Sequence, residues 1–135
     1  MSVTEDLSEV FERLRDVLED ETEELNVIHD EATKYEVRAG RVFFGSVVLR
    51  RTQVVFQLRA LETRPELGEE LPEPLRRRLQ GKAEFVFKTL DDVQAHGLAE
   101  LTRRAFDAYA REGEEVLRLA PGRSDTTPRP RKPRR

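Results

Sequence analysis

Apolar side chains recur along the first part of the chain at the spacing of one helix face. They are Leu7, Val10, Phe11, Leu14, Val17 and Leu18. Because an α-helix has about 3.6 residues per turn, positions three and four apart lie on the same side, so this spacing predicts an amphipathic helix. Thr4 precedes an acidic first turn and is predicted to cap the helix.

From residue 26 to residue 61 the pattern changes to short runs rich in β-branched and aromatic residues. Strands are predicted at residues 26–29, 35–37, 41–50 and 53–61, with turns at residues 39–40 and 51–52. In the last strand Val54, Phe56, Leu58 and Ala60 alternate with Val55, Gln57, Arg59 and Leu61. Such alternation is typical of an antiparallel strand with one face in the core. We expect the face with Gln57 and Arg59 to be partly exposed to solvent.

Prolines and glycines divide the next part of the chain into shorter elements. Residues 63–74 are predicted to form a loop. Pro74 is placed to begin a short helix that ends near Gln80, with Gly81 as its C-terminal stop. A strand at residues 84–88 follows and is predicted to bury Phe85 and Phe87.

A second amphipathic helix is predicted near the end of the chain, with Asp91 as its cap. Its apolar stripe is Leu98, Leu101, Ala105, Ala108 and Tyr109. Residues 114–120 either extend this helix or form a separate turn.

The order of elements predicts one α+β domain at residues 1–120, with an antiparallel sheet packed against N-terminal and C-terminal helices. A chain of 135 residues is long enough for one such domain. The side chains expected in its core are Phe11, Leu14, Val47, Phe56, Phe85, Leu98, Leu101 and Ala105.

Residues 121–135 differ in composition from the rest of the chain. They hold six basic residues and one acid, Asp125, and no large apolar side chain. Because such a segment cannot bury enough surface to offset the entropy of ordering, we expect a disordered basic tail. It could make nonspecific electrostatic contact with nucleic acid. The alternative is a solubilising tail, which either makes no specific contact or contacts the acidic helix of the same chain.

Composition also excludes several classes of protein. No apolar run approaches the roughly 20 residues that span a bilayer, so no membrane segment is predicted. The first residues lack the basic and apolar regions of a signal peptide. The chain has no cysteine and therefore no disulfide or thiolate site. We expect a cytoplasmic protein.

The first helix carries a band of carboxylates opposite its apolar stripe. This acidic face consists of Glu5, Glu9, Glu12, Asp16, Glu19, Asp20 and Glu23. Like charges three or four residues apart cost a helix about 0.2–0.5 kcal/mol per pair, yet the band contains no lysine. Carboxylate oxygens suit hard divalent cations, and the same charges suit a basic protein partner. The alternative is a solubilising surface without a ligand.

His29 follows this helix and could join a metal site at the C-terminal end of the helix. The alternative is that His29 ends a strand and makes only a local hydrogen bond. Asp92, His96 and Glu100 are spaced four apart, but a solvated helix face explains them better than a metal site. Gly81-Lys82 lacks the other residues of a P-loop. With no nucleophile–base pair, the sequence predicts no enzyme.

Several short blocks together resemble one family of small bacterial domains. They are Phe43-Phe44-Gly45-Ser46-Val47, Val55-Phe56-Gln57-Leu58, Pro65-Glu66-Leu67, Leu79-Gln80-Gly81-Lys82 with Phe85-Val86-Phe87-Lys88, and Leu98-Ala99-Glu100-Leu101-Thr102. Over roughly residues 10–110 the chain is similar to the YdhG-like family, most of whose members have no known function. The chain departs from the family pattern at Gln57, where many members carry a histidine.

The resemblance implies a frataxin-like fold, in which two helices pack against an antiparallel sheet. One member of the family is proposed to be a frataxin-type iron chaperone, and frataxin-like proteins use a comparable acidic ridge on their first helix. The resemblance therefore implies binding or delivery of iron or another divalent cation at the acidic face. The alternative is a non-enzymatic interaction module that docks a protein partner on the acidic helix or on the exposed sheet face.

Overall fold

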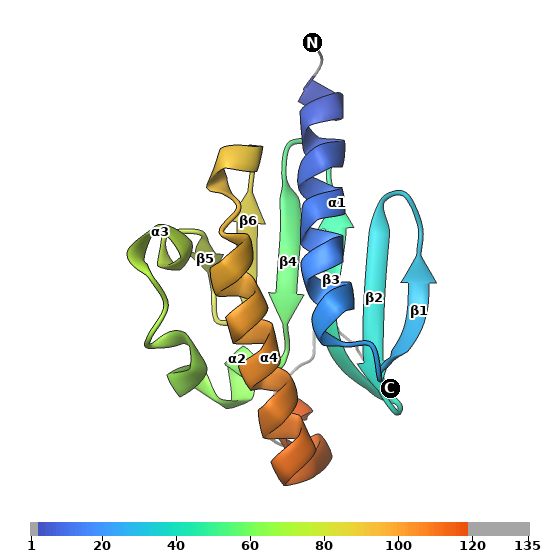
Figure 1. Cartoon of the computed structure of the whole chain (residues 1–135), viewed down its shortest axis with the longest axis vertical. Helices are drawn as coiled ribbons and strands as arrows, with labels where there is room; N and C mark the ends of the chain where they lie inside the picture. Colours follow the sequence, from blue (N-terminus) through green and yellow to red (C-terminus); the bar gives the residue numbers. More distant parts are fainter. Residues whose placement is uncertain (1–2, 119–135) are drawn as a thin grey trace, which may run out of the picture.

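A computed structural model describes residues 3–118, and the side chains of residues 7–118. Its centre is a six-stranded sheet in the order β1-β2-β3-β4-β6-β5, in which every pair of neighbours is antiparallel. The strands are β1 (Asn26–Asp30), β2 (Lys34–Ala39), β3 (Val42–Leu49), β4 (Val54–Leu58), β5 (Leu79–Gln80) and β6 (Glu84–Phe87). Figure 1 shows β1 at one edge of the sheet and β5 at the other.

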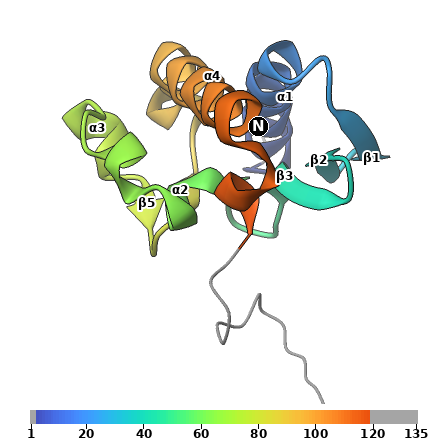
Figure 2. The same cartoon turned by 90° about the horizontal axis from the view of Figure 1, so that it is seen from below.

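Two long helices, α1 (Val3–Glu21) and α4 (Ala95–Glu112), lie side by side on one face of the sheet (Figures 1 and 2). The short helical elements are α2 (Ala60–Thr63), η1 (Pro65–Gly68), α3 (Glu73–Arg76), η2 (Leu90–Asp92) and η3 (Gly113–Leu117). The protein is therefore an α+β sandwich, as the order of predicted elements indicated. None of the helices in residues 3–118 has the length and apolar character needed to cross a membrane.

The core lies between the two long helices and the sheet. All eight side chains predicted to be buried are at most 2% exposed. Phe56 of β4 and Phe85 of β6 are cross-strand partners, and their rings pack edge to face with centroids 6.5 Å apart. The prediction of which residues form the core is confirmed.

The end of β4 differs from the prediction. The strand stops at Leu58, and Ala60–Thr63 form α2, in which Ala60 and Leu61 are both buried. Arg59, predicted to share the open face with Gln57, is instead buried because η3 lies over it. Its guanidinium stacks on the Phe43 ring at 5.0 Å and donates a hydrogen bond to the Leu117 carbonyl oxygen at 3.4 Å.

Gly81 has a different role from the predicted helix stop. It adopts φ +66° in the turn between β5 and β6, a left-handed conformation that glycine takes without steric cost. The helix α3 has already ended at Arg76. The predicted turn at residues 39–40 is confirmed by Gly40, which has the same φ of +66°.

Two predicted helix caps are also wrong by a few residues. Asp91 lies in η2, and α4 begins at Ala95 with Gln94 at its N-cap. Thr4 lies inside α1. After α4, Gly113 adopts φ +86° and η3 forms a separate turn, one of the two alternatives for this region. The predicted basic tail, residues 121–135, lies outside the described residues.

Candidate functional site

The acidic face follows the solvent-exposed side of α1. Because the apolar stripe of the helix packs on the sheet, the opposite side presents carboxylates to solvent. The exposed acids within the helix are Glu9, Glu12, Asp16, Glu19 and Asp20. Glu5 belongs to α1, but its side chain is outside the described part. Glu23 is exposed in the turn after the helix, which ends at Glu21.

Few basic side chains neutralise this surface. Asp16 lies 3.9 Å from the Arg15 guanidinium, and the other exposed acids of residues 9–23 make no ion pair with another described residue. Glu21 is different, because its two carboxylate oxygens each accept a hydrogen bond from Arg103 of α4 at 3.1 Å. These hydrogen bonds raise the pKa of Arg103 above its ordinary value. The ion pair joins the end of α1 to α4 and leaves the neighbouring carboxylates free to contact a ligand.

The C-terminal end of α1 forms a small pocket with α4. This acidic pocket has a volume of about 160 Å³ and is lined by Asp20, Glu21, Glu23, Glu24 and Phe106. Ligand sites for drug-sized molecules occupy about 300–1,000 Å³, so this pocket suits one charged side chain better than a whole small molecule. Four of its five lining residues are acidic and the fifth is aromatic, and both kinds of side chain favour a cation.

His29 lies on the edge strand β1, where its Nδ1 is 3.0 Å from a Glu31 carboxylate oxygen. This contact matches the local hydrogen bond given as the alternative to a metal ligand. The neighbouring Asp30 affects the pKa of the Tyr35 hydroxyl. Burial raises the pKa of Tyr35 to about 12, and the negative charges of Glu19 and Asp30 add to the effect.

The carboxylates do not converge on one point. In the part of the chain that the structure describes, no three histidine or acidic side chains are grouped so that they could hold a metal ion. His29 therefore joins no such group with the acids of α1. Asp92, His96 and Glu100 do not share a helix either, since Asp92 lies in η2 and pairs with Arg78 at 3.4 Å. Any metal held by the acidic face would be bound loosely by dispersed carboxylates.

A second concavity was not predicted from the sequence. A pocket of about 440 Å³, here named the loop pocket, lies between the segment from α2 to α3 and the β5–β6 turn. It forms because residues 59–78 leave the sheet after β4 and the chain then returns as β5. The prolines and glycine of residues 65–74 indicated a loop but not where that loop would pack.

Comparison with known proteins adds no relative, because no protein-family model, curated protein or solved structure matches this chain. The resemblance to the YdhG-like family stays a prediction.

Proposed function

We propose that this protein is a non-enzymatic binding module whose acidic face docks a positively charged protein partner. The observation that carries the proposal is the acidic pocket, which has about the size of one side chain and is lined by Asp20, Glu21, Glu23, Glu24 and Phe106. A lysine or arginine of the partner would enter this pocket, contact Asp20, Glu23 or Glu24 and lie against Phe106, while Glu21 stays paired with Arg103.

The charge pattern along α1 supports the same partner chemistry. Exposed carboxylates that outnumber the basic side chains on α1 create a negative potential that attracts basic surfaces and speeds their association. The open sheet face is less suited to docking. Val55 and Val86 at its centre are only 7% and 6% exposed, and Glu36 is already paired with Lys34 and Arg38 at 3.4 and 3.2 Å.

The proposal is tested by fluorescence anisotropy with a labelled octalysine peptide. Replacing Glu12, Asp16, Glu19 and Asp20 together by glutamine removes four charges from the acidic face. Exposed ion pairs contribute about 0.2–1 kcal/mol each, so four of them contribute about 0.8–4 kcal/mol and we expect affinity to fall about fourfold or more. Raising the salt concentration should weaken wild-type binding, because counterions screen exposed charges.

A matched variant separates the acidic face from net charge alone. Replacing the exposed acids Glu66, Glu73, Glu84 and Glu115 by glutamine changes the net charge equally but leaves α1 intact. This control should bind the peptide nearly as tightly as the wild type. Equal losses in both variants would mean that the peptide senses only overall charge, and would overturn the proposal.

Divalent-cation binding is the second candidate function, because the acids of α1 are exposed and mostly unpaired. Such carboxylates would hold iron or another divalent cation weakly and through water. Calorimetric titration with Fe²⁺ under anaerobic conditions tests this candidate. The same four glutamine substitutions in α1 should abolish the heat of binding, and no binding at millimolar Fe²⁺ would reject the candidate.

A further inference from the structure

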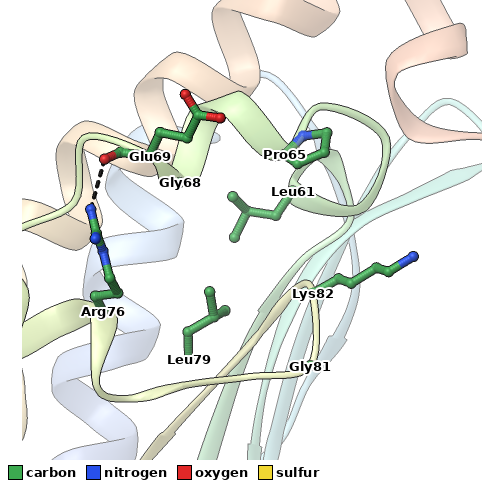
Figure 3. Close-up of a pocket in the computed structure, with 8 residues that line it drawn as sticks. All are labelled: Leu61, Pro65, Gly68, Glu69, Arg76, Leu79, Gly81 and Lys82. Atoms are coloured by element: carbon green, nitrogen blue, oxygen red, sulfur yellow. Dashed lines mark hydrogen bonds between the residues drawn. The ribbon is translucent and has the colours of Figure 1, made fainter.

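The loop pocket lies apart from the acidic face and has a different lining. Figure 3 shows Leu61 of α2 and Leu79 of β5 facing each other across it. Leu61 is 2% exposed and Leu79 is half-buried, so the floor of the pocket is apolar and firmly held. A volume of about 440 Å³ is within the range of small-molecule sites.

Two cations and one carboxylate accompany this apolar floor. Arg76 forms one wall, and Lys82 lies at the opposite end, where Figure 3 shows its side chain pointing away from the two leucines. No described carboxylate pairs with either side chain. The carboxylate of Glu69 also lines the pocket, but Figure 3 shows it pointing away from the two leucines.

Arg76 is held in place by the loop backbone. Its Nη2 donates to the carbonyl oxygen of Glu69 at 2.7 Å and lies 3.5 Å from that of Leu71. A guanidinium has five N–H donors, and its Nε and Nη1 make no hydrogen bond to any described residue. The positive charge is therefore positioned by the protein while part of its donor capacity stays available to a ligand.

We propose that the loop pocket binds a small amphipathic anion, such as a carboxylate on a short apolar chain. The apolar part would lie between Leu61 and Leu79. The anionic group would accept hydrogen bonds from Arg76, whose remaining donors suit a carboxylate. This site is independent of the acidic face and of its partner.

The test is a titration of the isotope-labelled full chain followed by amide NMR, with octanoate as the probe. Gly68 and Gly81 both line the pocket, so their amide resonances report binding. Octanol and octylammonium have the same chain length without the negative charge. We expect octanoate to shift both glycine resonances at millimolar concentration, octanol to bind more weakly, and octylammonium to bind least.

A matched pair of arginine variants tests the charge. Arg76→Gln should weaken octanoate binding about twofold to fivefold, as expected for an exposed ion pair. Arg77→Gln removes the same charge from an exposed residue outside the pocket and should have no effect. Leu79→Trp should fill the pocket and reduce octanoate binding further.

Three results would overturn the proposal. One is the absence of octanoate shifts at Gly68 and Gly81. Another is equal binding of octanol and octanoate, which would show that no anion is recognised. The third is the same loss of affinity in the Arg76 and Arg77 variants. Because the arginine pair changes only exposed side chains, the test does not depend on the folding of the Leu79 variant.

Discussion

Gly45 of β3 is the position where the structure predicts the sharpest effect of a single added methyl group. A Cβ atom at Gly45 would lie 2.8 Å from the Gln57 carbonyl oxygen and 3.1 Å from Leu58 Cδ2. The Gln57 oxygen belongs to the backbone of β4, which is paired with β3 on one side and β6 on the other. Since β4 is held on both sides, the clash cannot be relieved by moving one side chain.

The size of the effect follows from two opposing contributions. Overpacking a well-filled interior costs about 1–3 kcal/mol. Replacing glycine by alanine restricts the unfolded chain and returns about 0.4–1 kcal/mol. The difference between the mid-range values, about 2 and about 0.7 kcal/mol, predicts that Gly45→Ala lowers the free energy of unfolding by about 1.3 kcal/mol.

Urea denaturation followed by circular dichroism measures this change from the transition midpoint and slope. Gly68→Ala is the control, because its new Cβ would lie 3.4 Å from Leu61 Cδ2 and 3.8 Å from Leu71 Cδ1, which is ordinary contact. We expect the control to stay within about 0.5 kcal/mol of the wild type. A Gly45→Ala protein as stable as the wild type would refute the placement of β3 against β4.

Three further predictions concern the core, the pH dependence and the tail. Phe56→Ala should lower the free energy of unfolding by about 3–5 kcal/mol in the same urea assay, because the ring is fully buried. Burial and the charge of Glu19 raise the pKa of Tyr35 from 10.0 to about 12, so the native state keeps a proton that the unfolded state loses. The contribution of Tyr35 to the free energy of unfolding should therefore be complete below about pH 10 and be lost as the pH rises towards 12. In a Tyr109→Phe background, where Tyr35 is the one remaining tyrosine, Glu19→Gln should move the tyrosinate absorbance transition to lower pH. Deleting residues 122–135 should leave the thermal midpoint unchanged, whereas a drop of several degrees would show that this segment contacts the domain.

Local periodicity was sufficient to predict the two long helices, most strands and the core. Phe11 and Leu14 recur at helical spacing, and Phe56 and Phe85 lie at alternating strand positions, so their burial follows from the sequence pattern. The role of Gly81 did not follow, because a glycine with positive φ ends a helix as readily as it forms a hairpin turn.

The features that the sequence did not predict depend on contacts between distant residues. Arg59 is buried because η3 brings the Leu117 carbonyl oxygen over it, and no local pattern indicates that contact. The acidic face was visible in the sequence, but the acidic pocket required Phe106 of α4 to lie against the end of α1. The loop pocket likewise joins Leu61 to Leu79 across a loop that periodicity does not describe.

The central claim, that the acidic face is the docking surface, is tested most directly by mapping a basic peptide on the protein. Titrating octalysine into the isotope-labelled full chain and following amide NMR locates the contact. We predict that the largest shifts fall on Asp20, Glu21, Glu23, Glu24 and Phe106, and that at the same peptide concentration they become smaller in the α1 variant with four glutamines. Shifts spread over all acidic surfaces, or centred on the sheet face, would contradict the claim.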